Sequence, residues 1–308
     1  MAAKPTKIAV IGSGTIGLSF AALHLSRNTS CTVVIFDSRP DLQEYVSNNI
    51  SGYLVDTDQI SCIERISFAK TIEEAVEKAD IVQEQGPETA DFKIGIWPEI
   101  EKHAPKEALF WSSTSGIPAS DQSRDMMDKS RLVVVHPYNP PHIMPLLEVV
   151  RSPATSDDVI ERTLKYWRDI GRTPVEVKKE CVGFVANRLA FALLREASSL
   201  VSQGVVGVEE LDDIVCASMG PRWTVAGPFK SYHAGGGEGG LKSFMEKIGG
   251  TIQNCWDASD EDIRKGNIRV GESWQADICR QAAAAYGMAD TAERDRKTKN
   301  VLDVVQKR

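Results

Sequence analysis

The chain has 308 residues, of which 42% are hydrophobic and 26% are charged, a composition typical of a globular protein with room for two domains. Its net charge of −7 argues against a general nucleic-acid binder, although a small basic pocket for an anionic substrate remains compatible with it. No apolar run reaches the length of a membrane span, and the N-terminus leads directly into a predicted strand. Six scattered cysteines without a CxxC pair favour reduced thiols over disulfides or a metal site. We therefore expect a cytoplasmic protein with neither a nucleic-acid nor a membrane partner.

The first 37 residues carry the pattern of a dinucleotide site. A glycine-rich turn separates a predicted buried strand, 7–11, from a predicted amphipathic helix, 15–27. Such glycines allow a tight turn, the close approach of a pyrophosphate and close packing of helix on strand, while free N–H groups at the helix start favour an anion. The residues predicted to contact the pyrophosphate are Gly12, Gly14, Thr15, Ile16 and Gly17.

Two residues at the end of the second predicted strand, 32–37, and just after it bear on the choice of cofactor. Asp37 stands 20 residues after Gly17, where a carboxylate can bind the ribose hydroxyls and repel a 2′-phosphate. Arg39 follows closely and could hold a 2′-phosphate, or could stack near the adenine or face water. Because Asp37 is present, the sequence predicts NAD rather than NADP.

Strands and helices then alternate as far as residue 180. This alternation indicates βαβ units, that is, a doubly wound and mostly parallel sheet of the Rossmann type with helices on both faces. The later predicted strands are 66–69, 80–84, 108–112, 132–136, 146–150 and 174–178, and the predicted helices are 41–49, 72–78, 89–102 and 156–171.

From about Val182 the pattern predicts helices alone. The expected helices are 183–203, 209–218, 241–248, 274–286 and 293–305, and the glycine run 235–240 is expected to be a loop because it follows no strand. We therefore predict an α/β protein with an NAD-binding domain, 1–180, followed by an all-helical domain, 181–308.

Three polar residues in apolar segments suggest a catalytic site. His136 ends a predicted strand, where open parallel sheets bind ligands, and an imidazole there could exchange a proton with a substrate hydroxyl; a satisfied core histidine is the alternative. Glu148 lies in an otherwise apolar strand and needs a partner, for which His136 is the obvious candidate. Asn187 shares a helix face with apolar residues, so its amide is expected to be buried and hydrogen-bonded.

With these residues in their sequence contexts, HPYNP, LLEVV and GFVANR, the chain resembles the 3-hydroxyacyl-CoA dehydrogenase family from Lys7 to about Gly250. The resemblance implies a His136–Glu148 dyad, with Asn187 and Ser115 holding the substrate oxygen. It also implies that Glu88 and Lys93, in the segment 88–93, belong to the cofactor site, with Lys93 near the ribose, and that the protein is a homodimer. Ser115 as a mere turn hydroxyl and Lys93 as a solvated residue are the simpler alternatives.

One departure from the family concerns the substrate. A long lysine-rich helical hairpin that helps bind CoA has no counterpart in the roughly 30 residues between Phe36 and Ile66. The segment around Arg222 is similar to the subgroup of L-gulonate 3-dehydrogenase, lambda-crystallin and carnitine 3-dehydrogenase, which acts on free hydroxy acids. Arg222 could clamp a carboxylate, or it could only cap a helix or stack on Trp223.

The sequence thus predicts an NAD-dependent enzyme that interconverts a free 3-hydroxy acid and its 3-keto acid. A 3-hydroxyacyl-CoA thioester as substrate, and a non-catalytic NAD-binding protein of the crystallin kind, are the two alternatives.

Overall fold

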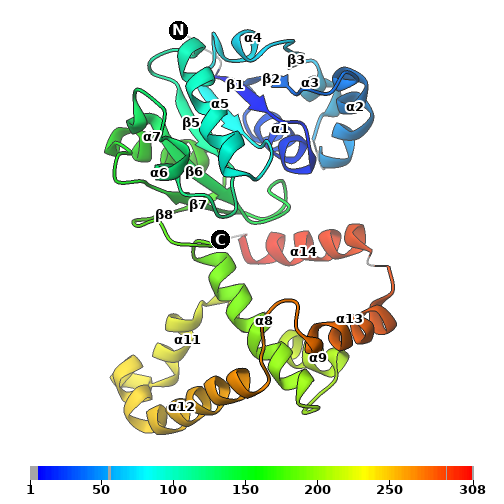
Figure 1. The fold of residues 1–308 in the computed structure, drawn as a ribbon, viewed down its shortest axis with the longest axis vertical. Helices are drawn as coiled ribbons and strands as arrows, with labels where there is room; N and C mark the ends of the chain where they lie inside the picture. The colour runs from blue at the N-terminus through cyan, green and yellow to red at the C-terminus, as the bar shows by residue number, and fades with distance from the viewer. Residues whose placement is uncertain (1–5, 55–56, 289, 307–308) are drawn as a thin grey trace. The chain divides into compact units, whose positions relative to one another are not determined.

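The computed structural model describes residues 6–54, 57–288 and 290–306 (Figure 1). It divides into two compact units, Met1–Arg188 and Leu189–Arg308. None of the described helices is both long enough and apolar enough to cross a membrane.

The first unit is built on one eight-stranded sheet with the order β3-β2-β1-β4-β5-β6-β7-β8. Neighbouring strands are parallel except β6 and β7, which are antiparallel. The strands are β1 (Lys7–Ile11), β2 (Thr32–Phe36), β3 (Ile66–Phe68), β4 (Ile81–Glu84), β5 (Leu109–Ser112), β6 (Leu132–Pro137), β7 (Leu146–Val150) and β8 (Thr173–Val177). The predicted doubly wound, mostly parallel sheet is confirmed.

Helices cover both faces of this sheet because successive strand residues point to opposite sides. In β1, Ile8 and Val10 belong to one buried cluster, whereas Ala9 and Ile11 belong to the other. The first cluster includes α1 (Thr15–Arg27), α2 (Leu42–Asn49), α3 (Gln59–Ile63) and α7 (Asp157–Asp169). The second includes α4 (Ile72–Val76), α5 (Ala90–His103) and α6 (Ala119–Gln122). Short 3₁₀ turns are η1 (Ile50–Tyr53) and η2 (Lys129–Arg131).

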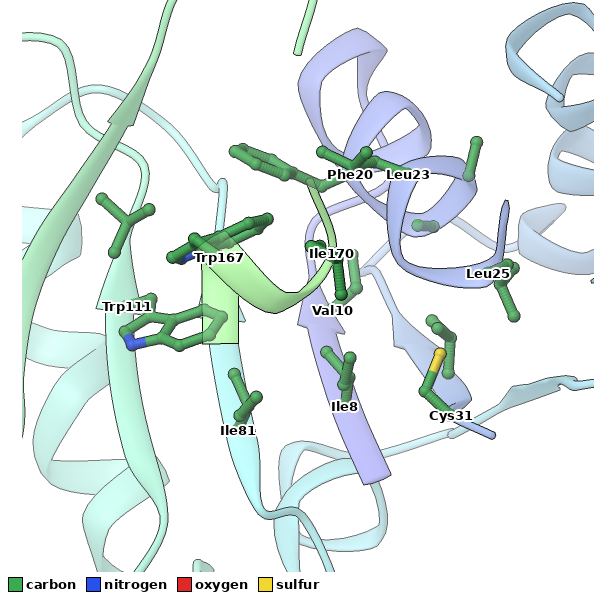
Figure 2. Packing of buried hydrophobic residues seen from close by; sticks show 14 of the residues in the cluster. Ile8, Val10, Phe20, Leu23, Leu25, Cys31, Ile81, Trp111, Trp167 and Ile170 are labelled. Atoms are coloured by element: carbon green, nitrogen blue, oxygen red, sulfur yellow. The ribbon is translucent and has the colours of Figure 1, made fainter. Parts of the chain in front are cut away.

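Large aromatic side chains fill the first cluster. The rings of Trp111 on β5 and Trp167 on α7 lie 5.1 Å apart between centroids, and Phe20 of α1 packs against Trp167 at 5.7 Å (Figure 2). All three side chains are completely buried. Each such ring removes a large apolar area from water, so this packing anchors α1 and α7 to the sheet.

The strand order reverses between β1 and β4, which are neighbours at the centre of the sheet. In an open α/β sheet, ligands bind at the carboxyl ends of the strands beside such a reversal. The glycine turn follows β1, Asp37 follows β2 and Ser113 follows β5, while His136 is the penultimate residue of β6. The fold therefore brings these segments to one edge of the sheet.

The second unit is helical, as predicted, but its helices differ from expectation in number and length. Two short helices between residues 219 and 235 were not predicted, and the helix expected at 241–248 continues to Lys265 through Gly249 and Gly250. Glycine lowers helix propensity without forbidding the helical conformation. The helices are α8 (Ala186–Ser202), α9 (Val208–Ala217), α10 (Met219–Val225), α11 (Pro228–Gly235), α12 (Gly240–Lys265), α13 (Ser273–Tyr286) and α14 (Thr291–Gln306), with a 3₁₀ turn, η3 (Gly237–Gly239), in the predicted loop.

Candidate active site

The turn after β1 has the shape that a pyrophosphate needs. Gly12 has φ +102°, a backbone conformation that favours glycine, and a Cβ at Gly17 would collide with the carbonyl oxygen of Gly12. A Cβ at Gly14, by contrast, would meet nothing within 4 Å, so the space beside this residue is open. Thr15 and Ile16 begin α1, where the first N–H groups have no acceptor within the helix. These positions therefore fit the pyrophosphate of a dinucleotide.

Asp37 is tied to the same turn. Its Oδ2 accepts hydrogen bonds from the N–H and the hydroxyl of Ser13 at 2.7 and 2.8 Å, and its Oδ1 accepts one from the N–H of Arg39 at 3.1 Å. Partial burial acts to raise the pKa of Asp37, but these hydrogen bonds outweigh it and the pKa is lowered. Asp37 is thus ionised at neutral pH, and Oδ1 retains a lone pair for a ribose hydroxyl.

Arg39, the residue for which the sequence left several roles open, is held by two neighbours. Its guanidinium pairs with the carboxylate of Asp41 at 2.8 Å and lies over the ring of Tyr45 at 3.4 Å from the centroid. Neither partner was singled out from the sequence.

Lys93 is buried in an ion pair on the carboxyl side of β4. Its Nζ lies 2.8 and 2.9 Å from the two carboxylate oxygens of Glu84, and the exposed fractions of the two side chains are 1% and 0%. Glu84 also accepts from the N–H of Gly86 and from the hydroxyl of Ser112. Burial raises the pKa of Glu84 even with Lys93 beside it. The contact of Lys93 with a cofactor ribose stays a prediction, since its ammonium group already has this structural partner.

Glu88 joins this ion pair to the turn that follows β5. One of its oxygens accepts from the Thr114 hydroxyl at 2.5 Å and from the Ser115 N–H at 2.8 Å, while the other lies 3.6 Å from Lys93 Nζ. The Ser115 residue is exposed, and none of the described residues hydrogen-bonds its hydroxyl. The hydroxyl is therefore available to a ligand, on a backbone that Glu88 fixes.

His136 and Glu148 form the pair that their sequence contexts suggested. They are directly opposite in the β6–β7 ladder, and His136 Nδ1 lies 2.8 Å from Glu148 Oε2. Both side chains are buried. Because an ionised carboxylate only accepts hydrogen bonds, Nδ1 carries the hydrogen, and in the neutral ring the lone pair is therefore on Nε2.

The second oxygen of Glu148 binds the backbone where α8 begins. Oε1 accepts from the N–H groups of Val185 and Ala186 at 2.8 and 3.0 Å. Burial acts to raise the pKa of Glu148, but the hydrogen bonds from His136, Ala186 and Val185 outweigh it and the pKa is lowered. The carboxylate is thus ionised, and the helix N-terminus adds to its stabilisation.

Phe184, which the sequence did not single out, completes this arrangement. Its backbone has φ +50°, rare for a residue with a side chain, and it follows Gly183 at φ +73°. This turn aims the next two N–H groups at Glu148, while the buried Phe184 ring packs 5.2 Å from the His136 ring. The glycine in the GF dipeptide was the available signal for an unusual backbone.

Asn187 lies in the first turn of α8, directly after the two residues that bind Glu148. We expected its amide to be buried and bonded; instead it is half-buried, and its side chain has no hydrogen bond to any described residue. The helix face on which Asn187 lies is also less buried than expected, since Phe191 and Leu194 on that face are 61% and 60% exposed. The apolar spacing predicted the helix correctly but not what covers this face.

Arg222 belongs to the second unit. It lies in α10, its side chain is exposed, and it makes no ion pair with any described acidic residue. Its guanidinium does not stack on the Trp223 ring. Among the described residues of its unit, Arg222 is thus a cation without a charged partner.

Comparison with known proteins identifies the family of the chain. The family model described as "3-hydroxyacyl-CoA dehydrogenase, NAD binding domain" matches residues 7–181, and "3-hydroxyacyl-CoA dehydrogenase, C-terminal domain" matches residues 183–272. The L-carnitine dehydrogenase of Oceanobacillus iheyensis is 36% identical over 81% of this chain and 82% of its own length. A 3-hydroxyacyl-CoA dehydrogenase of Gibberella moniliformis is 35% identical over 84% of this chain and 80% of its own.

A solved structure shares the whole architecture. The 5-formyl-3-hydroxy-2-methylpyridine 4-carboxylic acid 5-dehydrogenase, described as an NAD⁺-dependent dismutase, matches with a TM-score of 0.78 and 27% identity, covering 99% of both chains. The residues after β1 and β2 fit NAD, because the open space beside Gly14 and the ionised Asp37 meet its pyrophosphate and ribose. The chain therefore belongs to the 3-hydroxyacyl-CoA dehydrogenase family and is an NAD-dependent dehydrogenase that acts on a CH–OH group.

Proposed function

We propose that this enzyme oxidises a free 3-hydroxy acid of the carnitine or gulonate kind to the corresponding 3-keto acid, and catalyses the reverse reduction. The observation that supports this most is the hydrogen-bonded pair of His136 and Glu148, at the sheet edge that also carries the glycine turn. A buried histidine whose outer nitrogen bears a lone pair is a suitable base for a hydroxyl proton.

In the oxidation, Nε2 of His136 takes the proton of the substrate hydroxyl as the C–H bond at the same carbon breaks. Bound NAD supplies the hydride acceptor. Glu148 accepts a hydrogen bond from Nδ1–H throughout, so it stabilises the imidazolium that forms. In the reduction, the same imidazolium returns the proton to the oxygen.

Ser115 and Asn187 would hold the substrate oxygen. The Ser115 hydroxyl is exposed on a turn that Glu88 fixes, and Asn187 follows the N–H groups that bind Glu148. Neither side chain has another hydrogen-bond partner among the described residues, so each retains donors for a ligand.

A free carboxylate is favoured over a thioester for three reasons. The connection from Asp37 to Ala69 contains no lysine. Its two arginines already have partners, Arg39 in the carboxylate of Asp41 and Arg65 in backbone carbonyls, so neither is placed to bind the phosphates of CoA. Arg222, which pairs with none of the described acidic residues, would clamp the substrate carboxylate through two parallel hydrogen bonds. Several relatives are named L-carnitine dehydrogenase, and carnitine is a free 3-hydroxy acid.

A 3-hydroxyacyl-CoA thioester is the second candidate, because the relative from Gibberella moniliformis bears that enzyme's name. The test is NADH formation at 340 nm with L-carnitine, L-gulonate, 3-hydroxybutyrate and a 3-hydroxyacyl-CoA. We expect turnover of a free acid and none of the thioester. Turnover of the thioester alone would overturn the proposal, and NAD binding without any turnover would favour a non-catalytic, crystallin-like role.

We also propose a division of labour along the chain. Residues 1–180 would bind the cofactor, whereas residues 181–308 would contact the substrate and join two copies into a homodimer. Large apolar side chains exposed on the helical unit support a dimer, among them Phe191, Leu194 and Phe229. The six free cysteines are compatible with the cytoplasm. Light scattering coupled to gel filtration measures the oligomeric state, and a monomer would contradict this part.

A further inference from the structure

The guanidinium of Arg39 is engaged on two sides by neighbouring side chains. Nε donates to Asp41 Oδ1 at 2.8 Å and Nη2 donates to Oδ2 at 3.3 Å, so one edge of the fork is occupied by a carboxylate. One face lies over the ring of Tyr45, at 3.4 Å from the centroid. The backbone N–H of Arg39 is bound to Asp37. Charge and orientation of this arginine are therefore set by its own neighbours.

The side chain of Asp41 binds Arg39 instead of capping its own helix. It is the N-cap residue of α2, where an aspartate side chain usually accepts a hydrogen bond from an N–H of the first turn. No described N–H group of that turn donates to it. The side chains of Arg39 and Asp41 are 31% and 51% exposed, so the ion pair adds little to stability. We therefore expect this ion pair to have a role in ligand binding rather than in stability.

That role follows from the position of Arg39 beyond β2. An arginine here is the usual holder of a 2′-phosphate, because its fork matches the phosphate oxygens. In this chain Asp41 cancels its charge, and with Asp37 the three side chains sum to −1. A dianionic 2′-phosphate would thus meet net repulsion and an occupied guanidinium.

We propose that Asp41 is a specificity-determining residue, which excludes NADP by clamping Arg39 over Tyr45. The selection of NAD then rests on two carboxylates with different tasks. Asp37 binds the ribose hydroxyls, whereas Asp41 removes the cation that could compensate a phosphate.

The test compares cofactor binding in Asp41→Asn and in Glu44→Gln. Both variants lose one negative charge, but Glu44 is exposed on the same helix and contacts no described charged group. Dissociation constants for NADH and NADPH come from titrating cofactor fluorescence without substrate. We expect Asp41→Asn to shift the ratio of the two affinities about tenfold toward NADPH, and Glu44→Gln to leave it unchanged.

Two further measurements separate the clamp from a general charge effect. In the double variant Asp41→Asn/Arg39→Leu the gain in affinity for NADPH should vanish, because that gain depends on the guanidinium that the loss of Asp41 releases. Calorimetry with adenosine 2′,5′-bisphosphate and AMP should show the same shift at the ribose end alone. The proposal would be overturned if the affinity ratio is unchanged in Asp41→Asn, or if the gain in NADPH affinity survives in the variant that also lacks Arg39. It would also be overturned if Asp41→Asn loses both NADH binding and its folded structure, as measured by circular dichroism.

Discussion

His136 and Glu148 are cross-strand partners in the antiparallel ladder of β6 and β7, and their side chains are hydrogen-bonded on one face of the sheet. The register of two strands thus sets the distance between the candidate base and its carboxylate. A slip of one residue would send one of the two side chains to the opposite face. The turn at Phe184 then ties the same carboxylate to the start of α8.

We predict that His136→Gln lowers kcat by about 10²–10⁴ and leaves NADH affinity nearly unchanged, because the imidazole would act as a base and not as a cofactor ligand. Glu148→Gln should lower kcat in the same direction by less, since an amide still accepts from Nδ1–H without balancing an imidazolium. Steady-state kinetics with a fluorescence titration of NADH measure both. Undiminished turnover in His136→Gln would remove this residue from the mechanism.

Much of the fold was predictable because strands with continuous apolar runs can only be buried on both faces. The strand 146–150 was predicted from such a run, and its single charged residue, Glu148, required a partner. The same reasoning applies to Glu84, the last residue of β4, whose buried partner Lys93 comes nine residues later. A buried carboxylate at the end of a strand therefore also indicates a cation nearby in the fold.

Other contacts depend on backbone geometry that residue spacing does not encode. The clamp of Asp41 on Arg39 requires an N-cap side chain to turn away from its own helix. Phe184 adopts a positive φ for which the preceding glycine is the only signal in the local sequence. Helix ends in the second unit were missed for a related reason. Glycines at 249 and 250 normally weaken a helix, yet α12 runs through them.

We predict that Lys93→Met destabilises the protein by about 3–5 kcal/mol, because it leaves the carboxylate of Glu84 buried without a counter-charge. Adding Glu84→Gln should recover much of the loss, since a neutral amide costs less to bury. Thermal unfolding of both variants measures this. If Lys93 serves chiefly as a cofactor contact, Tm would instead stay near that of the wild type while the Kd for NADH rises.

We predict that His24 makes the free energy of unfolding sensitive to acid. Its Nε2 is 2.7 Å from Gln83 Oε1 and its Nδ1 is 2.7 Å from the Tyr166 hydroxyl, which suits a neutral ring, and burial lowers its pKa to about 4. The unfolded chain binds this proton near pH 6.5, so stability is complete above that pH and falls as the pH drops toward 4. At pH 5 the loss is about 2 kcal/mol.

The matched variant for this prediction is His24→Gln. Whatever its Tm at pH 7.5, it should lose less stability on acidification to pH 5 than the wild type does. Chemical denaturation at the two pH values measures the difference. Equal losses in both proteins would show that His24 is not the group responsible.

The final prediction concerns Arg222, which discriminates between free acids and esters of the same acids. If its guanidinium clamps the substrate carboxylate, Arg222→Met removes a charge-assisted pair worth roughly 2–5 kcal/mol, so kcat/KM for the acid should fall at least tenfold. The methyl ester offers no such charge, and its turnover should hardly change. Arg195→Met, in α8 of the same unit, serves as a control for the loss of one positive charge. Equal losses on acid and ester, or no loss on either, would make Arg222 structural and return the thioester to consideration.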